Sequence, residues 1–259
     1  MSGWDPARYL AFGDQRLLPG LDLIDALPKM APRSIADLGC GTGKLTALLA
    51  SKWPTASVVG IDSSEEMLAE AKRKHPRLQW LHARIEDWTA PADLIFSNAA
   101  LHWLGDHAAL LPRLRSQLSE GGVLAIQMPC NWTEPTHTIP ATILDGGEWS
   151  DEARHALPRN RVAEADTYRA WLPTAQVWEN VYEQSLAGDD PVFEWGMGSF
   201  LRPVWAALRP EERPRFEEAC KRAYRDAYPR KRDGTTVLPY RRLFIIATMT
   251  AAAATSAPS

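Results

Sequence analysis

The sequence predicts an α/β fold, in which a sheet carries helices on both faces and two late insertions add a mostly helical cap. Three observations lead to this prediction. Short apolar segments alternate with helix-like segments through the first half of the chain, as a doubly wound sheet requires. The first apolar segment runs directly into three glycines at alternate positions, Gly39, Gly41 and Gly43. The alternation then stops at Pro129 and is interrupted again from residue 188.

The length of the chain, 259 residues, is enough for one decorated domain with a full α/β core. We therefore expect a single domain over residues 1–259. Its core is expected at about 30–129, 163–187 and 236–250, and its cap at 1–20, 130–160 and 188–235.

The first half is expected to supply five strands and the helices between them. The expected strands cover residues 34–38, 57–61, 78–81, 94–97 and 122–128. The expected helices cover residues 43–52, 63–74 and 106–118. Pro54 and Pro76 follow the first two helices. They help to fix the helix ends, because a residue followed by proline disfavours the helical backbone conformation.

The second half departs from this rhythm. Residues 130–158 are rich in Trp, Pro and His, and we expect an irregular insertion there. A helix is expected over 163–172 and a strand over 177–186, followed by a mostly helical insertion over 188–234. The last strand is expected over 242–249, and its continuous apolar run predicts burial on both faces of the sheet.

Composition bears on the partners and the cellular compartment of the protein rather than on its activity. The formal net charge is -3, which predicts no general attraction to nucleic acid or membranes. Cys40, Cys130 and Cys220 are scattered, as is typical of reduced thiols. No apolar run is long enough to span a bilayer, and no basic-then-apolar signal segment opens the sequence. We expect a cytoplasmic protein with no metal, no membrane or nucleic-acid partner and no obligate protein partner.

The glycine turn predicts a site for a nucleotide-like cofactor. Glycines let the backbone turn tightly and approach a ligand where a Cβ atom would collide. The helix that follows directs its unpaired N–H groups at the turn. A dinucleotide site would need a sixth-position glycine, where this chain has Lys44, and the spacing of a phosphate-binding loop is absent.

Two acids narrow the choice of cofactor. Asp37 precedes the first glycine by two residues, and Asp62 ends the second expected strand. This pattern resembles the class I S-adenosylmethionine-dependent methyltransferases, which have a Rossmann-like sheet. The resemblance implies that Asp37 lies near the methionine amino group of S-adenosylmethionine and that Asp62, followed by Ser63, holds the ribose. It also implies that the glycine backbone makes room for the sulfonium portion.

Further cofactor contacts are expected where the strands end, because ligands of such sheets lie outside the carboxyl ends of the strands. The family resemblance implies backbone contacts from Ser97 and Asn98, with Ala99 beside them, and an apolar wall from Trp103. The family usually has an acid at the position of Arg84, so only the backbone of Arg84 is expected to reach the adenine.

Three remaining cofactor candidates each have a plainer alternative. Ile85 and Met67 are expected on the two faces of the adenine, and ordinary core packing is the alternative for both. Arg16 is expected to close over the methionine carboxylate or the acceptor, and its alternative is an ion pair between a lid and the core.

Four further segments carry a narrower resemblance, which extends over nearly the whole chain. These segments resemble trans-aconitate 2-methyltransferases, and they cover residues 4–19, 131–137, 198–203 and 236–244. The resemblance implies an enzyme that esterifies one carboxylate of an unsaturated tricarboxylate.

The charge pattern agrees with an anionic acceptor. Residues 202–242 contain twelve Lys or Arg and six Asp or Glu, although much of this surplus belongs to a solvated helix face. Arg202 stands beside a Gly-Ser-Phe turn and a proline, where its guanidinium could bind a carboxylate through two parallel hydrogen bonds. One of Arg241 and Arg242 must point away from the site if strand alternation holds. The residues expected to bind the acceptor are Arg202, Tyr240, Arg241, Trp132, His137, His102 and Tyr9.

The expected chemistry needs no catalytic base, and none is assigned. A carboxylate is already ionised at neutral pH, since its unperturbed pKa is about 4. Catalysis would then consist of positioning the acceptor and excluding water. Two alternatives remain open: a methyltransferase for another acid, a phenol or a carbon centre, and a non-catalytic protein that binds S-adenosylmethionine.

Overall fold

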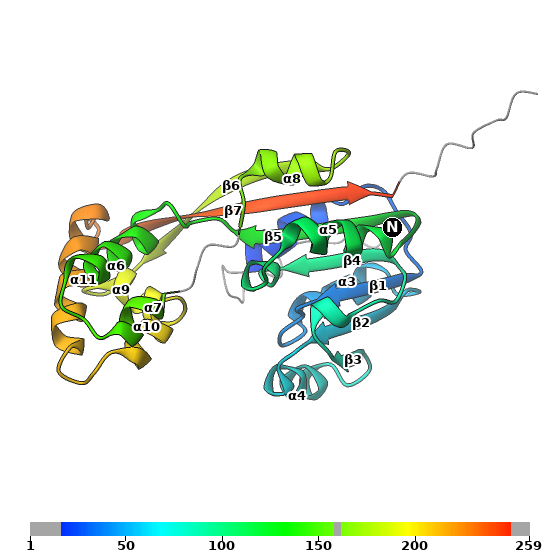
Figure 1. Cartoon of the computed structure of the whole chain (residues 1–259). Coiled ribbons are helices and arrows are strands. Elements are labelled where there is room, and N and C mark those ends of the chain that lie inside the picture. The colour runs from blue at the N-terminus through cyan, green and yellow to red at the C-terminus, as the bar shows by residue number, and fades with distance from the viewer. Residues whose placement is uncertain (1–16, 158–161, 250–259) are drawn as a thin grey trace, which may run out of the picture. The chain divides into compact units, whose positions relative to one another are not determined.

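The structure, a computed structural model, describes residues 17–157 and 162–249, and the chain divides into two compact units (Figure 1). The first unit comprises residues 1–129, 161–180 and 243–259, and the second comprises 130–160 and 181–242. The expected late insertions fall mainly in the second unit. Helix α2 (Leu18–Asp25), part of which was expected in the cap, belongs to the first unit and packs against β5 and α3 there.

A seven-stranded sheet has the order β3-β2-β1-β4-β5-β7-β6. The strands are β1 Ser34–Leu38, β2 Ser57–Asp62, β3 Gln79–His82, β4 Ala92–Asn98, β5 Leu118–Pro129, β6 Gln176–Leu186 and β7 Thr236–Thr248. Strands β1 to β5 are parallel, with Asp37 of β1 opposite Gly60 of β2 and Phe96 of β4. Strand β7 runs antiparallel to β5, as the backbone bonds from Gly121 to Met249 and from Cys130 to Arg241 require. The strand order reverses between β1 and β4, which is where such sheets bind their ligands.

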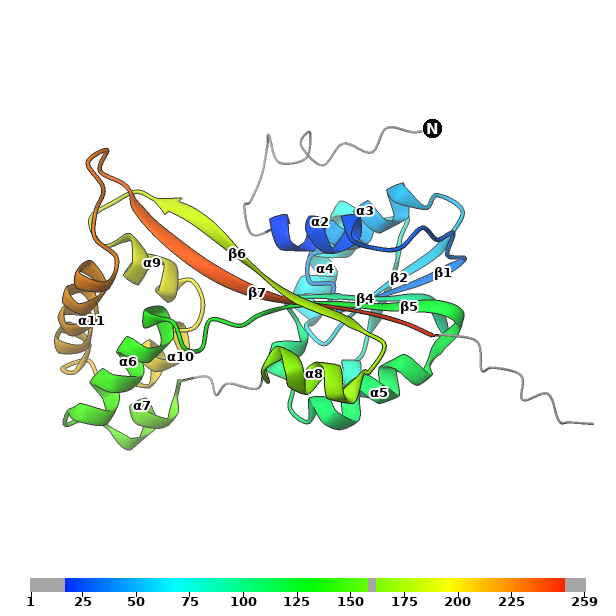
Figure 2. The same cartoon turned by 90° about the horizontal axis from the view of Figure 1, so that it is seen from above.

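Helices cover both faces of the sheet in the first unit. Figure 2 shows α2, α3 (Lys44–Lys52) and α4 (Glu65–Lys74) on one face and α5 (His107–Ser116) and α8 (Ala165–Trp171) on the other. The side chains of Ser64 and Asp106 cap α4 and α5 by accepting a backbone N–H three residues on. The predicted fold class and the five predicted parallel strands are therefore confirmed.

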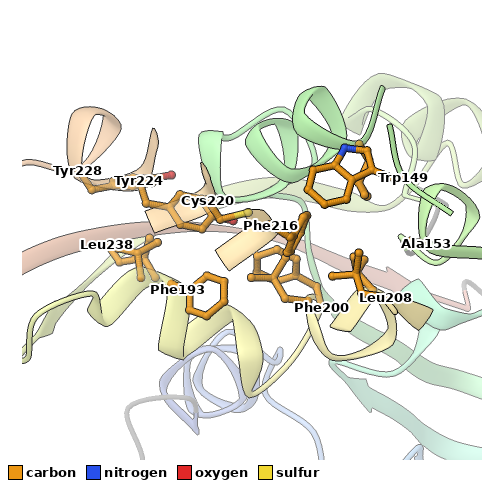
Figure 3. Close-up of a cluster of buried hydrophobic side chains, with 14 residues drawn as sticks. Trp149, Ala153, Phe193, Phe200, Leu208, Phe216, Cys220, Tyr224, Tyr228 and Leu238 are labelled. Atoms are coloured by element: carbon orange, nitrogen blue, oxygen red, sulfur yellow. The ribbon is translucent and has the colours of Figure 1, made fainter. Parts of the chain in front are cut away.

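The second unit contains five helices among its described residues. They are α6 Pro135–Gly146, α7 Asp151–His155, α9 Pro191–Met197, α10 Arg202–Ala207 and α11 Arg213–Ala227. Their core gathers around one face of α11, from which Phe216, Cys220 and Tyr224 point inward toward Phe193 and Phe200 (Figure 3). This spacing of four residues is that of an amphipathic helix. Within the described residues, no helix combines the length and apolar character that crossing a membrane would need.

The expectation of an irregular segment at residues 130–158 was wrong, because α6 and α7 lie there. Pro140 stands inside α6 and has no N–H for the carbonyl of Thr136. The hydroxyl of Tyr224 donates to that carbonyl at 2.8 Å, and the N–H of Thr136 donates to the hydroxyl of Tyr228 at 3.1 Å. Tyr224 and Tyr228 thus supply hydrogen-bond partners for the backbone of α6. The prolines of this segment had favoured a loop in the sequence analysis.

Strand β7 also begins six residues earlier than predicted, at Thr236 instead of residue 242. Its first part alternates between buried positions, at Thr236, Leu238 and Tyr240, and less buried positions between them. Pro239 hid this alternation in the sequence, because proline is unusual inside a strand.

Candidate cofactor and acceptor sites

The glycine turn after β1 has the close-packed geometry that its sequence predicts. Gly39 has a φ of +75°, and a Cβ atom there would lie 2.2 Å from the Cβ of Ala100. Gly41 has a φ of +54°, and a Cβ atom there would meet no heavy atom within 4 Å. Gly39 therefore lets the turn pack against the segment after β4, whereas Gly41 borders open space. Gly43 precedes α3 as its N-cap residue.

Asp62 holds this turn from the end of β2. Its Oδ2 accepts the N–H of Gly41 at 2.8 Å, and its Oδ1 accepts the N–H of Ser64 at 2.8 Å. Each carboxylate oxygen has a second lone pair, so both can still accept a hydroxyl. The carboxylate is fixed in place and retains the capacity that a ribose diol would use.

A cavity of about 620 Å³ opens beside Asp62 in the first unit. It is lined by Gly39, Gly41, Asp62, Ser63, Ser64, Met67, Arg84, Ile85, Glu86, Ala99, Ala100, Trp103 and Leu104. Met67 and Trp103 remain 43% and 58% exposed, which is high for large apolar side chains. Core packing is thus the wrong alternative for Met67, while Ile85 is both buried and part of the cavity wall.

A second cavity of about 240 Å³ borders the same turn, since Gly39 and Gly41 line both cavities. Asp37 and Asn98 line it and supply oxygen atoms that could accept hydrogen bonds. Oδ1 of Asn98 is buried and has no hydrogen-bond partner among the described residues. A buried carboxyl beside an unsatisfied amide oxygen suits an ammonium group.

Asp37 is strongly affected by its burial. Its side chain is 2% exposed, and the hydroxyl of Thr46 donates to its Oδ2 at 2.5 Å. Burial raises the pKa of Asp37 to about 7, against the opposing effect of Thr46, and the charge of Asp62 adds to the rise. A cation placed beside Asp37 would favour its ionised form.

The remaining first-unit candidates differ in their positions. The guanidinium of Arg84 pairs with Glu86 at 2.9 Å, so its side chain is engaged along the wall of the larger cavity. Ser97 is fully buried, and its hydroxyl donates to the carbonyl of Leu38 at 2.8 Å. Neither Ser97 nor Gly43 is among the residues that line the two cavities. Arg16 and Tyr9 lie outside the described residues.

The sequence did not single out all residues that line these cavities. Ser64 and Glu86 contribute polar groups to the larger one, and Leu17 and Lys44 line the smaller one. For Ser64 a signal existed, because it caps the helix that follows Asp62. Glu86 carried a weaker signal as the first acid after Arg84.

Two histidines of the first unit, His102 and His107, are built into its structure. His107 uses both ring nitrogens, Nδ1 with the hydroxyl of Tyr168 at 2.6 Å and Nε2 with the carbonyl of Leu101 at 2.9 Å. His102 is 9% exposed and packs on Trp103 with 4.6 Å between ring centroids. His102 is not among the residues that line the two cavities.

Several acceptor candidates meet in the second unit. The ring of His137 stacks on Phe200 with centroids 4.3 Å apart, and Trp132 meets it edge-on at 5.0 Å. Burial lowers the pKa of His137 to about 4, and the positive charge of Arg242 contributes. His137 is therefore neutral at physiological pH.

The three candidate arginines are placed differently. The guanidinium of Arg241 lies 3.6 Å from the carboxylate of Glu134, and the backbone N–H of Arg241 donates to the side-chain oxygen of Asn131. Arg202 is exposed at the start of α10 and makes no ion pair with any described residue. Arg242 lies over the ring of Tyr240, 5.1 Å from its centroid. The structure thus brings Tyr240 together with Arg242 rather than with Arg241, as the two-residue repeat of a strand requires.

Comparison with known proteins identifies the family. Residues 35–122 match the family described as a methyltransferase domain. A trans-aconitate 2-methyltransferase of Methylobacterium nodulans is 40% identical, over 96% of this chain and 100% of its own length. The enzyme of that name from Azoarcus is 41% identical, over 95% and 99%, and that from Pseudomonas aeruginosa 42%, over 95% and 94%. The chain belongs to the trans-aconitate 2-methyltransferase family.

Solved structures agree with the family in fold. The YcgJ protein of Bacillus subtilis has a TM-score of 0.57 at 15% identity, with 90% of this chain and 98% of that chain covered. A methyltransferase-like protein of Bacillus halodurans has a TM-score of 0.59 at 12% identity, with 89% and 98% covered. At such low identity these likenesses show the class I methyltransferase fold alone.

S-adenosylmethionine is the cofactor of this methyltransferase, and the residues present suit it. Gly41 leaves room beside the turn, and Asp62 retains acceptor capacity toward a diol. Asn98 and Asp37 offer oxygen atoms to an ammonium group in the adjoining cavity. The predicted cofactor is thereby confirmed, while the role of each residue remains a prediction.

Proposed function

We propose that this protein transfers a methyl group from S-adenosylmethionine to one carboxylate of trans-aconitate and releases the monomethyl ester. The observation that carries the proposal is the similarity to trans-aconitate 2-methyltransferases over nearly the full length of both chains. It includes the second unit, in which most acceptor candidates lie. A generic methyltransferase domain would account for residues 35–122 only.

The cofactor is held by the two cavities around the glycine turn. Asp62 accepts the ribose hydroxyls, while Asp37 and Asn98 accept the methionine ammonium. Met67 and Ile85 enclose the adenine, and Ser63, Arg84, Ala99 and Trp103 complete the larger cavity. When bound, S-adenosylmethionine supplies an electrophilic methyl group on a positively charged sulfur.

The acceptor needs orientation rather than deprotonation. Its carboxylates are ionised at neutral pH, since their ordinary pKa is about 4. His107 already uses both ring nitrogens, and burial keeps His137 neutral, so neither histidine is assigned a proton transfer. Orientation in a protected site supplies up to about 7–11 kcal/mol in favourable cases. We assign acceptor positioning to Arg202, Arg241, Tyr240, Trp132, His137, His102 and Tyr9.

We propose that the protein is located in the cytoplasm. All three cysteines lie in the described ranges and no disulfide joins them. Such cysteines are typical of a reducing compartment.

A panel of acceptors tests the proposal. The purified enzyme is incubated with methyl-labelled S-adenosylmethionine and, separately, with trans-aconitate, cis-aconitate, a saturated tricarboxylate, a monocarboxylate and a phenol. We expect the highest kcat/KM with trans-aconitate. A higher kcat/KM with the phenol or the monocarboxylate would contradict the proposal, as would a lack of turnover with every acid.

A further inference from the structure

Arg242 occupies an unusual environment in the second unit. Its side chain as a whole is half-buried, but its Nε is sealed from solvent and has no hydrogen-bond partner among the described residues. Within the described ranges, no carboxylate forms an ion pair with this guanidinium. Buried charges are normally paired, because taking a charge out of water without a partner is costly.

Among the residues that the structure describes, no carboxylate acts electrostatically on Arg242. The polar groups that act on it electrostatically are Tyr240, Cys130 and Tyr182. Tyrosine and cysteine side chains ordinarily carry no charge at pH 7. Burial lowers the pKa of the guanidinium, yet arginine stays charged at any physiological pH. The site therefore carries a positive charge that the described residues do not offset.

A second unsatisfied donor lies in the same cluster. The indole N–H of Trp132 is buried without a hydrogen-bond partner among the described residues. Trp132 contacts His137, which in turn lies close enough to Arg242 for the charge to lower its pKa. An indole and a guanidinium are donors only. Two buried donors call for an acceptor, and the unpaired charge of Arg242 favours an acceptor that is an anion.

We propose that Arg242, held over the ring of Tyr240 and in one cluster with His137 and Trp132, binds a carboxylate of the acceptor that does not receive the methyl group. This inference rests on the proposed function and names the residue that recognises the polycarboxylate. The bound carboxylate must be a non-reacting one, because hydrogen bonds to the attacking oxygen would lower its nucleophilicity.

The other two arginines are less suited to this role. Arg241 already has Glu134 as a partner, and Arg202 is exposed, where solvent and salt weaken an ion pair. Arg242 is pre-positioned by Tyr240, so binding a carboxylate requires little ordering of its side chain.

The test compares Arg242→Met and Arg242→Lys with a control, Arg222→Met, which removes a charge from the exposed face of α11. We expect Arg242→Met to raise the KM for trans-aconitate roughly tenfold to a hundredfold, as loss of a charge-assisted contact should. Arg242→Lys should recover part of this, because an ammonium lacks the planar fork of the guanidinium. The control should leave KM unchanged, and all variants should bind S-adenosylhomocysteine with wild-type affinity in calorimetry.

Two further readouts separate a binding role from a structural one. Turnover of crotonate, which has a single carboxylate, should fall little in Arg242→Met. Without an acceptor, Arg242→Met should unfold at or above the wild-type temperature, because it replaces an unpaired buried charge by an apolar side chain. A lower unfolding temperature or loss of folding would mark Arg242 as structural and overturn the proposal.

The proposal and the proposed function can fail separately. If the wild type methylates trans-aconitate and Arg242→Met keeps its KM, the subsite is wrong and the function stands. If the wild type methylates no polycarboxylate, the function is wrong. The subsite is then judged by calorimetry with tricarballylate, which Arg242→Met should bind at least tenfold more weakly than the wild type. Equal binding, or no binding to the wild type, would overturn the proposal.

Discussion

At the scale of single residues, Asp62 and Asp37 are both carboxylates beside the glycine turn, but their different surroundings suit them to different partners. Asp62 accepts two backbone N–H groups at the mouth of a cavity, whereas Asp37 is buried and accepts one hydroxyl. The first is suited to neutral hydroxyl donors and the second to a cation that offsets its charge.

Asp62→Ala should weaken S-adenosylmethionine binding at least about tenfold. Each hydrogen bond to a charged acceptor contributes about 1.5–3 kcal/mol, and about 1.4 kcal/mol corresponds to tenfold in affinity. Calorimetry measures the loss, and circular dichroism checks the fold. Glu66→Ala removes an equal charge from the exposed start of α4 and should bind normally. Unchanged affinity in Asp62→Ala would refute the ribose assignment.

Cofactor binding should release protons near pH 7. The pKa of Asp37 is raised to about 7 in the ligand-free fold, so a cofactor ammonium beside it should expel its proton. Affinity should then fall as pH drops below 7. Calorimetry in buffers of different ionisation enthalpy counts the protons, and Asp37→Asn should abolish their release. Undiminished release in that variant would assign the proton to another group.

The same shift has a consequence for stability. Between pH 3.8, the ordinary pKa, and about 7, the folded protein binds more protons at Asp37 than the unfolded chain does. The contribution of Asp37 to stability is therefore present at low pH and decreases as pH rises through this window.

Residue-level prediction from the sequence brought residues together where a motif fixes the backbone. Asp62, Gly41 and Met67 were all expected at the cofactor and line one cavity. It grouped Arg241 with Tyr240, whereas the structure places Arg242 over the Tyr240 ring, because the start of β7 was misplaced and the alternation was not counted from Tyr240.

At the scale of elements, two glycines of the same turn are needed for different reasons: Gly39 for packing and Gly41 for binding. Gly39→Ala should destabilise the fold by several kcal/mol, since a positive φ costs about 1–3 kcal/mol and the new Cβ would overlap Ala100. Gly41→Ala adds only the cost of its φ, because its surroundings are open. Urea unfolding measures both effects. Gly41→Ala should fold yet bind the cofactor more weakly, and normal binding would show that the open space does not serve the cofactor.

Helix α6 shows why some elements escape prediction. Pro140 removes one backbone donor, and the compensating hydroxyl comes from Tyr224, which is 88 residues along the chain from the carbonyl of Thr136. No local pattern carries that information. The parallel strands, by contrast, follow from continuous apolar runs with turn residues between them.

At the scale of the whole molecule, carboxylate chemistry without a base predicts a simple pH profile. With both substrates saturating, kcat should be nearly flat from about pH 6 to 8, since the acceptor is ionised and His137 neutral throughout. His102→Ala and His137→Ala should change KM for the acceptor more than the shape of the profile. A steep rise near pH 7 that disappears in one of these variants would indicate a general base.

The most direct measurement is the chemical identity of the methylated product. The enzyme is incubated with trans-aconitate and methyl-labelled S-adenosylmethionine, and the product is then treated with mild alkali. A carboxylate ester hydrolyses and releases volatile labelled methanol, whereas an ether or a carbon-bound methyl group survives. The proposed function predicts one alkali-labile methyl group per trans-aconitate. A product whose label resists alkali, or the absence of labelled product, would contradict it.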